Sequence, residues 1–186
     1  ELGLNITDGQ IAEMKKFQND INYDDAHKFE REVRHDVMAH VKAFGKQAKS
    51  AEPIIHLGAT SCYVTDNAEV IIIDDALNIV LKKLVNVMDK LKKFALQYKS
   101  VPTLGFTHLQ PAQLTTVGKR ATLWLSDLEM DYIDLMHLKN TVKLRGVKGT
   151  TGTQASFLDL FNGDGEKVKV LEKKVVAKLG YSKVYG

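Results

Sequence analysis

Cysteine and proline are both scarce in this sequence of 186 residues: Cys62 is the one cysteine, and proline occurs only at positions 53, 102 and 111. A single cysteine excludes a disulfide within the chain and is typical of a reducing compartment, so we expect a cytoplasmic protein. No apolar run reaches the ~18 residues that a membrane-spanning helix requires, and no signal-like segment opens the sequence. These absences favour a protein with no membrane partner.

A large excess of charge of one sign is also absent. Lysine and arginine together number 26 and aspartate and glutamate 23, which leaves a formal charge of +3. The most basic stretch, LKKLVNVMDKLKKF, places its lysines on the polar face of an amphipathic pattern, which indicates a solvated helix surface. Because basic residues are interleaved with acidic ones, we expect no nucleic-acid partner.

The scarcity of proline leaves room for long helices, because proline interrupts a helix. The segment TDGQ, which begins at Thr7, has the spacing of a capping box and predicts a short helix to about Asn19. Further along, apolar residues recur three and four positions apart, as they do on one face of a helix. This spacing predicts an all-α fold with further helices over residues 24–44 (ending at Gly45), 65–98, 112–145 and 163–179.

The two middle helices are unusually long. Each exceeds 30 residues, or about 50 Å, whereas a globular helix averages about 11 residues. Two such rods cannot bury their apolar stripes in one small core, so we expect an elongated bundle that packs against other chains. The sequence starts at Glu1 rather than Met and stops directly after a helix-like segment, so we expect a piece of a longer protein.

The segment RHDVMAH contains three adjacent polar residues, Arg34, His35 and Asp36. They form either a solvated helix end or a helix face at a cleft, where Arg34 and His35 donate to an anion and Asp36 accepts from a hydroxyl. His35 and His40 are five positions apart and do not share a helix face, so we expect no metal site.

Two polar turns precede the long predicted helices. In HLGATSCYVTDN, Thr60 and Ser61 either cap a helix or bind a carboxylate or phosphate with their hydroxyls and nearby backbone N–H groups. In TLGFTHLQPAQ, His108 is flanked by Thr107 and is expected just before the next helix. It is either part of a capping loop or a general acid or base facing a cleft. The glycine-rich GVKGTTGT lacks the ending of a P-loop.

Four motifs, in this order and with compatible spacing, resemble the adenylosuccinate lyase family in the form found in animals and their relatives: RHDVMAH, HLGATSCYVTDN, TLGFTHLQPAQLTTVGKR and GVKGTTGTQASF. This family belongs to the fumarase/aspartase superfamily. The resemblance implies a long-helix bundle of the fumarase/aspartase type, incomplete in this chain, and a homotetramer. Residues 1–60 would be the later part of an N-terminal helical domain, and residues 61–186 the beginning of the central helical-bundle domain.

The resemblance also implies a reaction. The family eliminates fumarate from adenylosuccinate to give AMP, and from succinylaminoimidazolecarboxamide ribotide, in purine biosynthesis. His108 matches the general acid that protonates the departing nitrogen, and no metal or organic cofactor is implied. The positions that match substrate-contacting residues are Arg34, His35 (near the nucleotide phosphate), Asp36, Thr60, Ser61 and Thr107.

One departure from the family pattern limits this expectation. The family's mobile loop, with its catalytic serine and a sequence like SSxMPxKxN, does not occur in the chain, and neither do the later substrate-binding arginines. Family active sites draw on three subunits, so we expect this piece alone to be inactive and the general base to lie beyond residue 186. Two alternatives remain: an argininosuccinate-type lyase, against which the motif forms argue, and a non-catalytic helical oligomerisation module.

Overall fold

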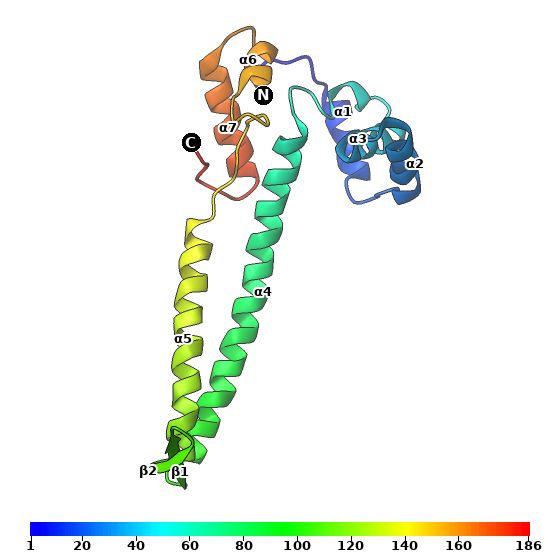
Figure 1. Cartoon of the computed structure of the whole chain (residues 1–186). Coiled ribbons are helices and arrows are strands. Elements are labelled where there is room, and N and C mark those ends of the chain that lie inside the picture. The colour runs from blue at the N-terminus through cyan, green and yellow to red at the C-terminus, as the bar shows by residue number, and fades with distance from the viewer. The chain divides into compact units, whose positions relative to one another are not determined.

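A computed structural model describes residues 1–186, which divide into two compact units (Figure 1). The first unit combines residues 1–70 with residues 143–186, and the second contains residues 71–142. Helices predominate, and the one sheet is a two-stranded hairpin. The helical fold class predicted from the sequence is therefore confirmed, with this hairpin as an addition to it.

The helix α4 (Ser61–Gln97) starts in the first unit and continues into the second, and no helix in the chain is long and apolar enough to span a membrane. The other elements of the first unit are α1 (Asp8–Phe17), α2 (Tyr23–Val33), α3 (Asp36–Gln47), a 3-10 turn (Glu52–Ile54), α6 (Ala155–Leu160) and α7 (Gly165–Lys178). The second unit adds β1 (Pro102–Thr107), β2 (Gln110–Thr116) and α5 (Val117–Thr141).

The start of α1 has the predicted capping box. The Thr7 hydroxyl accepts from the Gln10 backbone N–H at 3.2 Å, and the Gln10 side-chain oxygen accepts from the Thr7 N–H at 2.9 Å. The amide of Gln10 also donates to the Ser50 carbonyl at 2.8 Å, which ties α1 to the segment after α3. The cap therefore serves both the helix start and the packing of the unit.

The prediction of a single helix over residues 24–44 is wrong. The chain turns at Arg34, which adopts a left-handed conformation with φ of 52°, and His35 then caps α3. Apolar spacing did not reveal this break, because valines at positions 33 and 37 keep helical spacing across it. Gly45 does not end the helix either: it lies buried within α3, where a β-carbon would come within 2.8 Å of the Glu52 side chain.

The core of the first unit forms around the C-terminal helices. Val147, Phe157, Phe161 and Val168 are buried together, and Tyr63 packs its ring edge-on against Phe157 with centroids 5.7 Å apart. Tyr63 belongs to the first turn of α4. This packing of apolar surface therefore holds the start of α4 against the segment that precedes α7.

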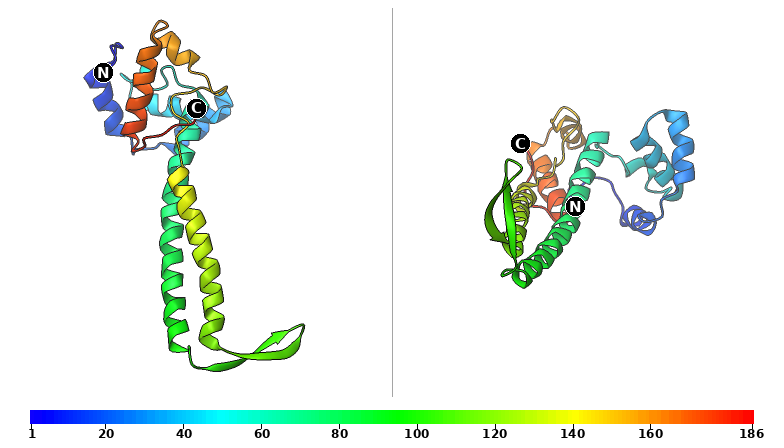
Figure 2. Two further views of the ribbon diagram at one scale, coloured as in Figure 1. Left: turned by 90° about the vertical axis from the view of Figure 1, so that its left-hand side faces the viewer. Right: turned by 60° about the horizontal axis from the view of Figure 1, so that its bottom comes forward.

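The second unit contains the hairpin that the sequence did not predict. Strands β1 and β2 pair antiparallel from Pro102 opposite Thr116 to Thr107 opposite Gln110, with an irregularity at Gly105 (Figure 2). The predicted helix over 112–145 is therefore too long at both ends, because β2 occupies its first residues and α5 ends at Thr141. Pairing across the strands decided the structure here, and neither helical period nor the single proline in β2 revealed it.

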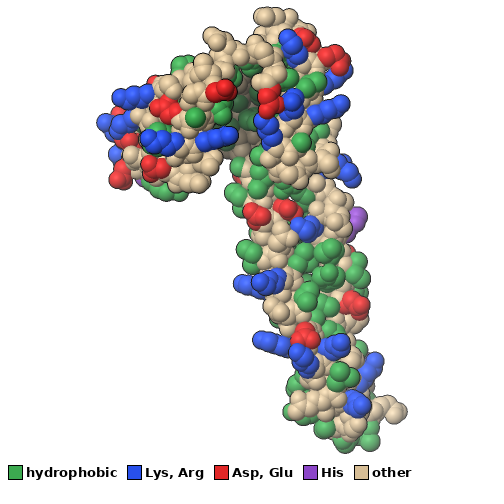
Figure 3. Space-filling view, turned by 180° about the vertical axis from the view of Figure 1, so that it is seen from behind, with side chains coloured by type: hydrophobic (Ala, Val, Ile, Leu, Met, Phe, Trp, Pro, Cys, Tyr) green, Lys and Arg blue, Asp and Glu red, His purple; other side chains and the backbone are tan.

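Gly118 at the start of α5 permits close contact with α4. A β-carbon there would come within 2.3 Å of the Ala95 carbonyl oxygen, and the Gly118 N–H donates to the Tyr98 carbonyl at 2.9 Å. Many apolar side chains of the two helices nevertheless remain exposed in this chain (Figure 3). Those at least half exposed are Ile72, Ile73, Ile79, Val87, Leu96, Leu123, Trp124, Met130 and Ile133.

Candidate functional site

The turn between α2 and α3 brings His35 against Ser61, which lies 26 positions away in the sequence. As the N-cap of α3, His35 accepts the Met38 backbone N–H at Nδ1, at 3.3 Å. A neutral imidazole that accepts at Nδ1 carries its proton on Nε2, which lies 3.1 Å from the Ser61 hydroxyl oxygen. The helix cap therefore favours the tautomer in which His35 donates to Ser61.

Arg34 and Asp36 flank this histidine on an exposed surface. Asp36 accepts from the Val37 backbone N–H at 2.7 Å and lies 3.4 Å from His35 Nδ1. An open groove of about 680 Å³ runs along this surface and contains two arginines, two histidines and two carboxylates. The lining residues are His27, Glu30, Arg31, Arg34, His35 and Asp36.

Thr60 occupies the cap position of α4, because its carbonyl accepts from the Tyr63 N–H at 3.0 Å. Its hydroxyl does not cap the helix: the oxygen is buried and has no hydrogen-bond partner within the chain. A buried hydroxyl without a partner is costly, and a ligand oxygen would satisfy it. The free N–H groups and positive end of a 37-residue helix also favour an anion at this place.

His56 is a member of this group that sequence reasoning missed. Its ring is partly buried, and burial lowers its pKa below the ordinary 6.5, with a further contribution from nearby His35. Its place four positions before Thr60 was the only sequence signal, and that spacing did not show that His35 would lie close. Arg34, His35, Asp36, Thr60 and Ser61 thus share the first unit with an additional imidazole.

Thr107 and His108 lie in the second unit, at the tip of the hairpin. The prediction that His108 directly precedes a helix is wrong, because strand β2 separates it from α5. His108 and Leu109 form the two-residue turn with φ of 50° and 61°, a conformation that favours glycine or asparagine. The His108 side chain is exposed and makes no hydrogen bond or ion pair within the chain.

Comparison with known proteins gives this arrangement a class. A family model described as lyase matches residues 5–168, and the chain belongs to that lyase family. Two solved structures share its fold: a fumarate lyase from Mesorhizobium sp. BNC1 (TM-score 0.79, 22% identity) and a 3-carboxy-cis,cis-muconate lactonizing enzyme from Pseudomonas putida (TM-score 0.82, 23% identity). They cover 96% and 98% of this chain, which spans 41% of each of them.

Curated relatives narrow the class further. The chain is 54% identical over 189 residues to the adenylosuccinate lyase of Saccharomyces cerevisiae and 52% identical over 188 residues to that of Schizosaccharomyces pombe. Each match covers 100% of this chain and 39% of the relative, so the chain spans about two fifths of their length. The resemblance to adenylosuccinate lyases that four sequence motifs predicted is therefore confirmed.

Proposed function

We propose that the whole protein to which this chain belongs eliminates fumarate from adenylosuccinate to give AMP, and from succinylaminoimidazolecarboxamide ribotide in the same way. The observation that carries the proposal is the buried, unpartnered Thr60 hydroxyl beside Ser61 and His35 at the start of α4. This arrangement suits a substrate with two carboxylates and a phosphate, which needs several donors. We take adenylosuccinate as the proposed substrate from the names of the curated relatives.

In this proposal the donors of the first unit bind the anionic groups of the substrate. Thr60 and Ser61 hold carboxylate or phosphate oxygens, Arg34 donates to an anion, and Asp36 accepts from a hydroxyl. His35 donates to an anion when its Nε2–H turns from Ser61 to the bound group. A base from another part of the protein removes a proton from the succinyl Cβ. The resulting carbanion, delocalised into a carboxylate, is stabilised by donors that are already in place.

His108 is the proposed general acid. The C–N bond breaks as the imidazolium gives its proton to the departing nitrogen, and fumarate and the purine product separate. Thr107 is expected to contact substrate beside it. Because His108 has no partner within the chain, its orientation in this proposal comes from surfaces of neighbouring subunits in a homotetramer, against which the exposed apolar faces of α4 and α5 also pack.

Replacing His108 with glutamine in the full-length protein tests this function. Loss of general acid help is expected to lower kcat for fumarate release from adenylosuccinate about 10²–10⁴-fold. The matched control is His137→Gln, an exposed histidine on α5, which is expected to retain activity. Unchanged turnover by the His108 variant would remove the residue from the mechanism.

The same assay separates the alternatives. Release of fumarate from argininosuccinate, but not from adenylosuccinate, would indicate the argininosuccinate-type lyase. A full-length tetramer that eliminates fumarate from neither substrate would instead indicate a helical oligomerisation module.

A further inference from the structure

The first residues of α4 are held to the segment 145–154 by a buried asparagine. Asn67 is 5% exposed, and its side chain exchanges two hydrogen bonds with Gly146: Oδ1 accepts from the Gly146 N–H and Nδ2 donates to the Gly146 carbonyl, both at 3.0 Å. Gly146 has φ of 79°, and a β-carbon there would come within 2.4 Å of the Glu172 carboxylate. This pairing therefore fixes one backbone position of the segment against α4.

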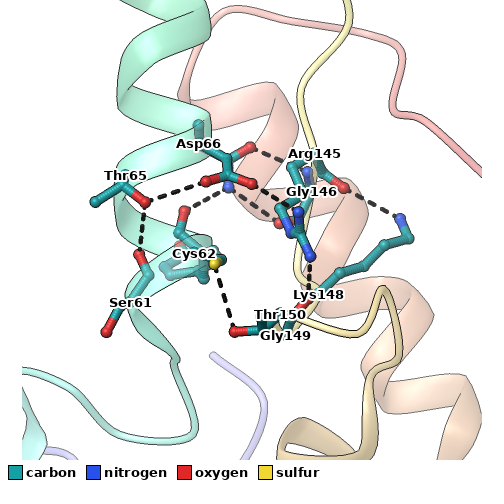
Figure 4. A network of polar contacts seen from close by, with 11 residues as sticks. Ser61, Cys62, Thr65, Asp66, Arg145, Gly146, Lys148, Gly149 and Thr150 are labelled. Atoms are coloured by element: carbon teal, nitrogen blue, oxygen red, sulfur yellow. Dashed lines mark hydrogen bonds and ion pairs between the residues drawn. The ribbon is translucent and has the colours of Figure 1, made fainter.

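A chain of polar contacts continues from this point toward Ser61 (Figure 4). Arg145 donates from Nη1 to Asp66 at 2.6 Å and from Nη2 to the Gly149 carbonyl. The Thr65 hydroxyl lies 3.1 Å from both the Asp66 carboxylate and the Ser61 carbonyl. Arg145 thus joins the first turns of α4 to the glycine-rich part of the segment with two charge-assisted hydrogen bonds.

The glycine-rich part lies against residues on both sides of Ser61. Gly149 is buried so close to Thr60 that a β-carbon at 149 would lie 3.5 Å from the Thr60 methyl group. The Thr150 hydroxyl donates to the Cys62 sulfur at 3.4 Å. The segment therefore packs against the turn that carries the two hydroxyls that the proposed function assigns to substrate.

The opposite side of the segment is anchored on α7. Glu172 accepts from the Val147 backbone N–H at 3.1 Å and from Lys148 at 2.7 Å, and Gln154 donates to the Val147 carbonyl at 2.9 Å. The lysine and the glutamate are 12% and 19% exposed, so water screens their attraction only in part. This segment is thus held from two helices, and the Thr60–Ser61 turn lies beside it.

We propose that Arg145, with Asp66 and Asn67, is a positioning residue that holds the Thr60–Ser61 turn in the geometry that binds an anionic group of the substrate. The inference rests on the proposed function. Arg145 acts through the Gly149 backbone and through Asp66, and it does not touch substrate itself. Its removal is expected to weaken substrate binding by loosening the turn, while the groups that move protons are unchanged.

Steady-state kinetics of the full-length protein test the positioning role. Arg145→Met removes both contacts and is expected to raise KM for adenylosuccinate about tenfold, with kcat nearly unchanged. Arg145→Lys can keep only one contact and is expected to restore part of the loss. Asp66→Asn has a matched control in Asp74→Asn, since Asp74 is also on α4 in a partly exposed ion pair, with Lys139 at 3.1 Å.

The lone thiol supplies a second readout that does not depend on turnover. The rate of Cys62 alkylation by N-ethylmaleimide, followed on its tryptic peptide by mass spectrometry, reports how often the segment opens. The rate is expected to rise about five- to tenfold in Arg145→Met and to a smaller extent in Asp66→Asn, as fits the loss of a charge-assisted hydrogen bond. Asp74→Asn is expected to keep the wild-type rate.

Each result either supports or overturns the positioning role of Arg145. Unchanged KM and unchanged alkylation in Arg145→Met and Asp66→Asn would overturn the positioning role. So would a fall in kcat at constant KM, because that places the residue in the chemical step. If the unmodified protein did not act on adenylosuccinate, the proposed function would fail, and the alkylation rates alone would decide whether Arg145 holds the Thr60–Ser61 turn. If Arg145→Met did not fold, Asp66→Asn and Arg145→Lys carry the same test.

Discussion

The start of α4 and the tip of the hairpin differ sharply in how the chain supports them. Near Ser61, hydrogen bonds from α3, α7 and the segment 145–154 hold the backbone and the ring of His35. At the hairpin tip, His108 has no side-chain partner, and Leu109 beside it is 99% exposed. The proposed binding groups are thus held by contacts within the chain, whereas no contact within the chain orients the proposed acid.

The largest effect that this contrast predicts is on the activity of residues 1–186 in isolation. Residues 1–186 expressed alone are expected to release no measurable fumarate from adenylosuccinate, because the proposed base and the surroundings of His108 are missing. The full-length protein assayed in parallel is the control. Appreciable turnover by the shorter chain would show that His108 needs no partner surface, and the contrast between the two regions would disappear.

The next effect concerns Thr60, whose buried hydroxyl has no partner. In Thr60→Val of the full-length protein, KM for adenylosuccinate is expected to rise about tenfold, because a donor to the substrate is lost. The free energy of unfolding is expected to stay equal or increase by about 1 kcal/mol, since the isosteric methyl removes an unsatisfied polar group. Chemical denaturation of the free protein measures this second quantity.

The control for Thr60 is Thr122→Val, since the Thr122 hydroxyl already donates to the Lys119 carbonyl at 2.7 Å. It is expected to leave KM unchanged. A Thr60 variant that lost stability and kept its KM would show that the hydroxyl serves the fold rather than a ligand.

A contact could be predicted from the sequence only when its two residues lie close together along the chain. The capping box at Thr7 was predicted correctly because its two partners are three positions apart. The contact between His35 and Ser61 and the pairing of Asn67 with Gly146, 79 positions away, were not predicted, because no local pattern encodes them. The site motifs were found by their resemblance to a family, and their residues were then located by the structure.

The hairpin shows that a local pattern can also be ambiguous. The stretch from Gln110 to Thr116 contains leucine and threonine, which fit either a helix or a strand, and a single proline did not decide between them. Pairing with β1 made the choice. Glycine at position 105, where the strand pairing is irregular, has a specific reason, because a β-carbon there would come within 2.8 Å of the Gln113 carbonyl oxygen.

The smallest expected effect is a pH dependence at His56. Burial, and secondarily the charge of His35, lower its pKa below 6.5, so the folded chain favours the neutral ring. This contribution to stability is fully present above the unfolded pKa and is lost as the pH falls through the folded pKa. His56→Gln is therefore expected to make the stability of the chain depend less on pH as the pH falls below about 7.

Urea unfolding of the wild type and the His56 variant at several pH values measures this difference. His27→Gln is the control, because His27 is largely exposed. Equal pH slopes for the wild type and His56→Gln would contradict the inferred burial of the imidazole near the start of α4.

The left-handed turn at Arg34 means that one substitution there would remove a functional group without lowering the stability of the protein. An arginine with φ of 52° carries a backbone cost of about 1–2 kcal/mol that glycine does not have. Replacement by glycine would therefore delete the guanidinium and relax the turn at the same time. Such a protein is expected to keep its stability and its abundance. It would nevertheless lack the guanidinium that lines the groove.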